Sequence, residues 1–166
     1  MLTDPHVLRD YYNKVKSQYD IIFCTQSPYS NGGDEFYLPY AYDVEWHKPT
    51  IQEKIYDVML IGNTYSNRVD LMDTLKGFGI KTYFNLGIAK DDVAPLMSQS
   101  LIGLNWSSLD DLTARVWEIM GCGQIPVINR VTDLQYFFKE DEEDVGCSTK
   151  DEARRNVQMI LDTPGR

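Results

Sequence analysis

The sequence predicts an α/β fold, a doubly wound parallel sheet with helices on both faces, preceded by part of a second domain. Two observations favour this fold. From residue 56 onward, short apolar segments alternate with helical segments through short loops, as in parallel sheets. Within that region, residues 113–128 (TARVWEIMGCGQIPVI) indicate an amphipathic helix, a glycine break and a buried strand. Ligands of such sheets bind at the carboxyl ends of the strands, which is the edge where this helix begins.

The first 49 residues show a less regular pattern. A helix is predicted over Pro5–Ser17, with Asp4 as its N-cap and the proline in the first helical position. A strand is expected over Tyr19–Cys24, followed by a polar loop over 25–35. The aromatic segment that begins at Phe36 has neither a helical nor an alternating period as far as Pro49, so it is interpreted as a connector. We therefore place a domain boundary after it, with residues 1–49 before the boundary and the main domain over 50–166.

The main domain alternates between the two kinds of element. Strands are predicted over 56–61, 80–84, 101–105, 125–128 and 145–147, and helices over 67–76, 91–97, from 113, 132–138 and 151–161. Gly121 and Gly123 are expected to end the central helix. Pro126 is expected at the start of its strand, because a proline cannot donate to a sheet ladder.

The composition limits the classes of protein that fit. The chain has 166 residues, 43% of them hydrophobic, which suits one globular domain with a core and part of a second. Its net charge of -9 argues against binding to a nucleic-acid backbone or a membrane surface. No run reaches the roughly 18 apolar residues of a membrane span, and the first residues lack the pattern of a signal peptide. We therefore expect a cytoplasmic protein.

Cysteine and histidine usage argues against several kinds of site. Cys24, Cys122 and Cys147 are widely spaced and form no CxxC pair, so reduced, buried thiols are expected. His6 and His47 are the only histidines and lie far apart in the sequence, which makes a catalytic triad or a histidine-rich metal site hard to build. No metal ligands are predicted.

Familiar phosphate-binding motifs are also missing. There is no GxGxxG after the strand at 56–61 and no GxxxxGK[ST] anywhere. A phosphate would have to be held by another device, and the start of the helix at Thr113 is one, because its free N–H groups and partial positive charge attract anions. Arg115 and Glu118 follow within one turn.

Several segments carry a resemblance to a known family. YDVMLIGN, NRVDLMDTL, SLIGLNW, DLTARVWEIMGCGQIPVI and TDLQYFF resemble, in order and spacing, the C-terminal half of the CgeB-like glycosyltransferases, a spore-maturation-type branch of the group 1 glycosyltransferases of GT-B fold. YDIIFCT and YLPYAYDVEWHKP resemble the end of that family's N-terminal domain and its interdomain linker. The resemblance implies a Rossmann-like domain that binds a nucleotide-sugar donor, a UDP- or GDP-sugar, for transfer of a hexose to an unknown acceptor. It implies no cofactor and no tightly bound metal.

The resemblance also implies roles for individual residues. Arg115 would stabilise the leaving nucleoside diphosphate and Glu118 would accept hydrogen bonds from the ribose, so these two are the catalytic candidates. The candidates for donor binding lie at strand ends and helix starts: Gly62, Asn63, Arg68, Asn105, Asp110 and Thr113.

Most of these assignments have a structural alternative. Arg115 and Glu118 also fit a surface ion pair at i, i+3. Gly62 and Asn63 also fit a tight turn, Arg68 a solvated helix residue, and Asn105 a strand-end cap that bonds the backbone. His47 is expected to be structural or exposed.

The chain departs from the family pattern in two respects. Retaining members commonly carry two glutamates separated by seven residues, and here Asp110 stands at the first position. Most of the N-terminal domain and the crossing C-terminal helix are missing, although GT-B catalysis takes place between two domains. We expect a donor-binding domain that is weakly active or inactive alone. The alternative is a truncated, non-catalytic module that binds a nucleotide or a protein, with residues 28–49 covered by a second copy of the chain or by a partner domain.

Overall fold

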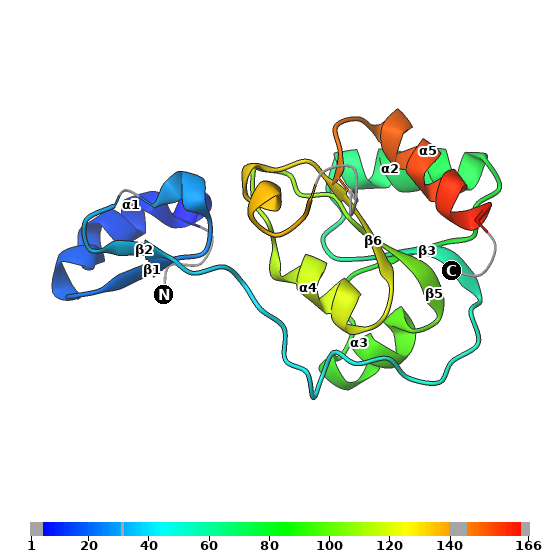
Figure 1. The fold of residues 1–166 in the computed structure, drawn as a ribbon, viewed down its shortest axis with the longest axis horizontal. Coiled ribbons are helices and arrows are strands. Elements are labelled where there is room, and N and C mark those ends of the chain that lie inside the picture. The colour runs from blue at the N-terminus through cyan, green and yellow to red at the C-terminus, as the bar shows by residue number, and fades with distance from the viewer. Residues whose placement is uncertain (1–4, 31, 140–145, 164–166) are drawn as a thin grey trace.

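The computed structural model of the chain describes residues 5–30, 32–139 and 146–163 (Figure 1). The predicted fold class is confirmed, because five parallel strands form a sheet in the order β4-β3-β5-β6-β7 with helices on both faces. Its elements are β3 (Tyr56–Ile61), α2 (Ser66–Gly77), β4 (Thr82–Asn85), α3 (Lys90–Met97), β5 (Ser100–Asn105), α4 (Ala114–Gly121), β6 (Ile125–Asn129), the 3-10 helix η3 (Thr132–Tyr136), β7 (Gly146–Cys147) and α5 (Lys150–Leu161). Asp4 and Val145, for which a cap and a strand residue were predicted, lie outside the described residues.

The sheet is buried between two layers of helices, as Figure 1 shows. Val58 and Leu60 of β3 pack with α2 and α5, whereas Met59 and Ile61 pack with α3 and α4. Alternate residues of a strand point to opposite faces, so a strand covered on both sides must be apolar throughout. This is why β3 has a continuous apolar run.

The central helix α4 packs closely on β5 and ends where the glycines predict. A Cβ atom on Gly103 would lie 2.5 Å from the side chain of Ile119, so the helix can approach the strand only over a glycine. After α4, Gly123 has a φ of +74°, and the amide of Gln124 donates to the Ile119 carbonyl. This is a Schellman motif, which leads the chain directly into β6. Pro126 is the second residue of β6, not the first, and the pairing of β6 with β7 begins only at Ile128.

The N-terminal unit contains α1 (Pro5–Val15), the 3-10 helices η1 (Lys16–Gln18) and η2 (Ser27–Tyr29), and the parallel pair β1 (Ile22–Cys24) and β2 (Glu35–Tyr37). The predicted strand over Tyr19–Cys24 is therefore twice as long as the observed β1. The segment from Phe36 was predicted to be an irregular connector, and this was wrong for Phe36 and Tyr37, which belong to β2. β2 has only three residues, and its backbone pairs with β1 across a long loop, so no local pattern indicates it.

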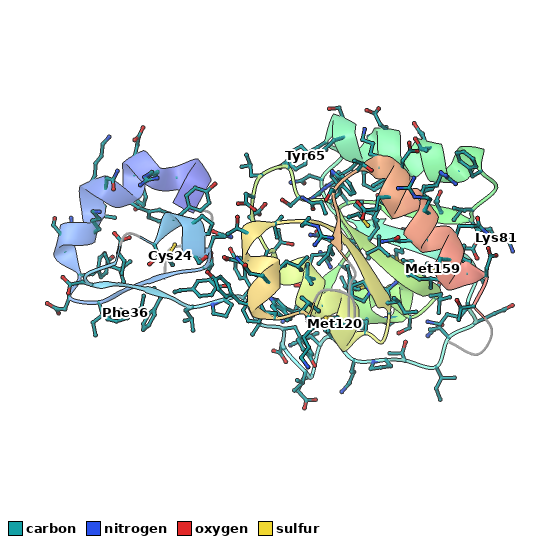
Figure 2. The ribbon with its side chains drawn as sticks, turned by 45° about the horizontal axis from the view of Figure 1, so that its top comes forward. Cys24, Phe36, Tyr65, Lys81, Met120 and Met159 are labelled. Carbon is teal, nitrogen blue, oxygen red and sulfur yellow. The ribbon has the colours of Figure 1, made fainter. Side chains whose placement is uncertain are left out.

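Figure 2 shows Phe36 of β2 on the outer side of this unit. The Phe36 side chain is 51% exposed, and its ring centroid lies 6.3 Å from that of Phe23 on β1. Cys24, by contrast, is fully buried.

Residues 38–55, here called the linker, run from the N-terminal unit across α4 and α3 to β3 (Figure 1). A Cβ atom on Gly121 would lie 2.6 Å from the Tyr42 ring and 2.9 Å from the carbonyl oxygen of His47. Further along, the Lys90 ammonium of α3 lies 3.7 Å from the centroid of the Trp46 ring. The end of α4 is thus shaped to accept the linker.

The N-terminal unit also contacts the main domain directly, through η2 and η3. The Ser27 amide donates to Asp133 Oδ2 at 2.9 Å, and the Ser27 hydroxyl donates to Oδ1. Asp133 is 2% exposed. Beside it, burial and then the negative charge of Asp133 raise the pKa of the Tyr37 phenol well above its usual range. The Tyr37 and Tyr136 rings pack with centroids 6.2 Å apart.

Candidate functional site

The candidate site lies at the carboxyl edge of the sheet, beside the start of α4. The parallel register aligns Ile61 with Asn85 on one side, and Asn105 of β5 with Ile128 of β6. Loops that leave these strands therefore gather at one edge, which is where ligands of doubly wound sheets bind.

Arg68, in the first turn of α2, spans this edge. Its Nε donates to the Trp106 carbonyl at 2.5 Å and its Nη1 donates to the Asn63 carbonyl at 3.2 Å. A Cβ atom on Gly62 would lie 3.0 Å from Nη1, so the glycine leaves room for the guanidinium. Asn63 thus contributes its carbonyl to the site, and Gly62 contributes the lack of a side chain. Arg68 is a fixed side chain, not a solvated one.

Arg115, in the first turn of α4, brings a second positive charge. Its Nη1 lies 2.7 Å from Glu118 Oε2, but the buried Nη1 makes no hydrogen bond of good geometry with any described residue. Burial lowers the pKa of Arg68 from its usual value, and the positive charge of Arg115 lowers it further, although Tyr65 and Asp111 act in the opposite direction. Arg68 and Arg115 thus come from the first turns of two helices that begin at the same edge of the sheet.

The start of α4 has no side-chain cap. Thr113 occupies the N-cap position, but its side chain does not cap the helix and instead donates to Asn105 Oδ1 at 3.3 Å. The Thr113 and Asn105 side chains are thus tied to each other. A helix start without a side-chain cap favours an anion as its partner.

Glu118 lies between two positively charged or chargeable groups. One carboxylate oxygen is the partner of Arg115, and the other, Oε1, lies 3.8 Å from His47 Nε2 of the linker. Burial, and then the charge of Glu118, raise the pKa of the nearby Cys122 thiol to about 11. No local sequence pattern predicts this position of His47, because the contact joins the linker to α4.

Comparison with known families gives the decisive observation: the model of the family described as glycosyl transferase-like matches residues 45–166, which is most of the chain. The chain belongs to the glycosyl transferase-like family. Among curated protein sequences, none matches it.

Solved structures show the same fold for this glycosyl transferase-like chain. A mutant of S. aureus TarM, in complex with fondaparinux, alpha-GlcNAc-glycerol and UDP, is 7% identical with a TM-score of 0.68, over 93% of this chain and 39% of that one. Sucrose-phosphate synthase from Thermosynechococcus elongatus is 13% identical with a TM-score of 0.65, over 99% and 55%. The GtfA/B complex is 11% identical with a TM-score of 0.62, over 93% and 41%. This chain thus spans about half or less of each neighbour, and the likeness is one of GT-B fold.

Asp110, the residue at the first glutamate position, is hydrogen-bonded to Thr132 of η3. Its Oδ1 accepts from the Thr132 amide at 2.6 Å and its Oδ2 accepts from the Thr132 hydroxyl. It therefore caps η3. Its neighbour Asp111 accepts from the Ser107 hydroxyl at 2.5 Å, and the Ser107 amide donates to Asn129 Oδ1. These bonds fix the loop before α4.

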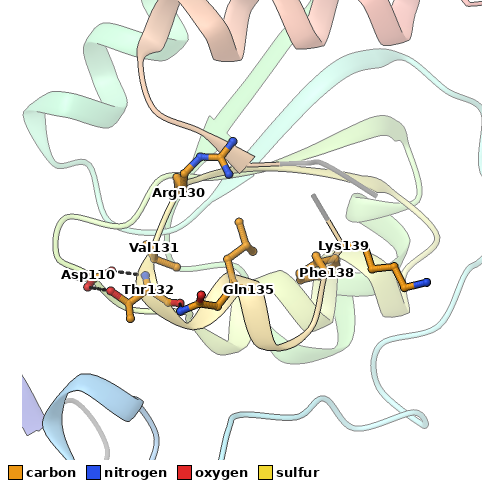
Figure 3. Close-up of a pocket in the computed structure, with 8 residues that line it drawn as sticks. Asp110, Arg130, Val131, Thr132, Gln135, Phe138 and Lys139 are labelled. Atoms are coloured by element: carbon orange, nitrogen blue, oxygen red, sulfur yellow. Dashed lines mark hydrogen bonds between the residues drawn. The ribbon is translucent and has the colours of Figure 1, made fainter. Parts of the chain in front are cut away.

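Asp110 also lines a pocket of about 700 Å³ above the end of β6 (Figure 3). The other described lining residues include Arg130, Gln135, Phe138 and Lys139. None of these described lining residues is Arg68, Arg115 or Glu118, so this hollow is separate from the arginine pair. Arg130 is held against β7 by the Ser148 hydroxyl and the Gly146 carbonyl.

Over residues 5–30, 32–139 and 146–163, no cluster of three or more His, Cys, Asp or Glu side chains is arranged to hold a metal ion. Over the same ranges, no helix combines the length and apolar character needed to cross a bilayer.

Proposed function

We propose that this chain binds the diphosphate of a nucleotide-sugar donor between Arg68 and Arg115 at the start of α4, and that it serves transfer of the sugar to an acceptor. The observation that supports this most strongly is the position of two arginines in the first turns of different helices, α2 and α4, at the carboxyl edge of the sheet. Guanidinium groups at this edge suit a diphosphate, because they can donate bidentate, charge-assisted hydrogen bonds to its oxygens.

Each residue has a role in this proposal. Arg68 has its Nε and Nη1 bound to carbonyl groups, which directs the guanidinium toward the strand ends. Arg115 and the amides of α4 stabilise the charge that develops on the leaving nucleoside diphosphate as the sugar bond breaks. Glu118 accepts hydrogen bonds from the ribose hydroxyls. These cations do the work of a divalent metal, so we propose a metal-independent reaction with no cofactor.

The donor is a UDP- or GDP-sugar, and the family branch is the CgeB-like one. UDP is the first ligand to test, because the TarM complex of similar fold contains it. We assign the reaction to the cytoplasm, since all three cysteines are free and buried.

A second candidate is a module that binds a nucleotide or a protein without turnover. It is favoured by the exposed apolar side chains of the N-terminal unit, among them Ile21, Phe23 and Phe36. A surface of this kind suits association with a partner domain or a second copy of the chain.

The experiment is a calorimetric titration of the purified chain with UDP, GDP, TDP and their sugars, alongside an Arg115→Ala, Glu118→Ala double variant. Tight binding of one nucleoside diphosphate that vanishes in the variant supports the proposal. Binding that survives in the variant overturns it. Donor hydrolysis or transfer, measured on the same samples, separates an enzyme from a binding module.

A further inference from the structure

We propose that His47, in the linker, is a positioning residue that holds Glu118 for the ribose of the donor and thereby ties the linker to the donor site. The inference rests on the proposed function and extends it to a residue outside α4. Its basis is the position of the Glu118 carboxylate between Arg115 on its own helix and His47 on the linker.

Each oxygen of the Glu118 carboxylate faces a different neighbour. Oε2 lies 2.7 Å from Arg115 Nη1 and Oε1 lies 3.8 Å from His47 Nε2, which is too long for a hydrogen bond. The side chains of Arg115, Glu118 and His47 are 26%, 19% and 15% exposed. A carboxylate that is mostly buried needs a positive or hydrogen-bonding partner to remain charged.

The backbone of His47 is held firmly, whereas its ring is not. The amides of Trp46 and His47 both donate to the Asp43 carbonyl, at 3.1 and 2.8 Å, and form a tight turn. The His47 carbonyl lies against Gly121, at a distance that leaves no room for a side chain there. Yet His47 Nδ1 is buried and has no hydrogen-bond partner among the described residues. Glu118 is thus the polar group toward which the ring is turned.

Donor binding changes the partners of Glu118. A diphosphate at the start of α4 attracts the Arg115 guanidinium, because a phosphate bears more charge than a carboxylate and accepts bidentate bonds. Glu118 Oε2 then becomes free for a ribose hydroxyl. His47 Nε2, 3.8 Å from Oε1, can donate to that oxygen after a small closing movement, which keeps the carboxylate oriented.

The test is a calorimetric comparison of UDP, 2′,3′-dideoxy-UDP and inorganic pyrophosphate on the wild type, His47→Phe and His47→Gln. Phenylalanine keeps the ring and removes the donor, whereas glutamine keeps an N–H donor. We expect His47→Phe to weaken UDP binding about tenfold, the loss typical of one charge-assisted bond. Binding of pyrophosphate and dideoxy-UDP should stay within about twofold, and glutamine should restore most of the UDP affinity.

The outcomes separate the two proposals. If the folded wild type binds none of UDP, GDP, TDP and pyrophosphate, the proposed function itself is overturned. If the wild type binds UDP but His47→Phe binds it equally well, or loses pyrophosphate to the same extent, the role of His47 is overturned alone. A His47→Phe, Glu118→Gln double variant guards against a folding defect, because a positioning role predicts no further loss of UDP affinity beyond Glu118→Gln.

Discussion

Arg68 and Arg115 come from the first turns of two different helices, α2 and α4, that begin at the same edge of the sheet. Arg68 is held by the carbonyl groups of Trp106 and Asn63, and Arg115 by its contact with Glu118. The fold therefore maintains two like charges at the edge where a doubly wound sheet binds ligands.

The first prediction concerns the fit of the linker on α4. Gly121→Ala places a methyl group 2.6 Å from the Tyr42 ring, so either the linker or the helix must shift. We expect a loss of roughly 1–3 kcal/mol in the free energy of unfolding, measured by urea denaturation. Gly77→Ala is the matched control, because a Cβ atom at that helical position meets nothing within 4 Å. Equal stability of the two variants would show that the linker does not depend on this contact.

The second prediction concerns the contact between the N-terminal unit and η3. Ser27→Ala removes the hydroxyl that donates to the buried Asp133 carboxylate, leaving Oδ1 without that partner. Loss of one hydrogen bond to a buried charged group should destabilise the contact by about 1–3 kcal/mol. Limited proteolysis should then cut the linker faster than in the wild type. Ser108→Ala, at an exposed serine, is the control, and equal cutting rates in both variants would refute the role of the contact.

The third prediction follows from the Cys122 thiol. Burial and the charge of Glu118 raise its pKa in the folded state from 9.0 to about 11. Because the unfolded chain releases this proton first, the thiol contributes stability that is complete below pH 9 and is lost as the pH rises toward 11. Unfolding measured at several pH values should show this loss, and Cys122→Ala should make the dependence shallower. The same slope in both proteins would contradict the assigned shift.

Much of the fold could be predicted because its signal is local. Alternation of apolar and helical segments indicates each element of the parallel sheet, and Gly121 and Gly123 indicate where α4 ends. β2 was missed since its three residues form a strand only by pairing with β1 across a long loop. A short strand of this kind depends on a partner that no sequence window contains.

In the candidate site, too, contacts within one segment could be predicted and contacts between distant segments could not. Helical spacing places Arg115 beside Glu118. Arg68 comes at the start of the helix that follows β3, so the alternating pattern predicts that it lies at the same edge of the sheet. Contacts between distant segments could not be predicted, among them His47 with Glu118 and Ser27 with Asp133. Asn129 did carry a usable signal, because it follows an apolar strand just as Asn105 does. Whether Asp110 also serves the donor stays a prediction, with its carboxylate bound to Thr132 in this structure.

The most direct test of the arginine pair is the affinity for UDP of the wild type, Arg68→Gln, Arg115→Gln and the double variant, measured by calorimetry. If one diphosphate joins both guanidinium groups, each single variant should lose about tenfold or more in affinity, and the losses should be non-additive. Lys76→Gln, an exposed substitution at the far end of α2, should leave the affinity unchanged. Undiminished UDP binding by the folded double variant would contradict the account.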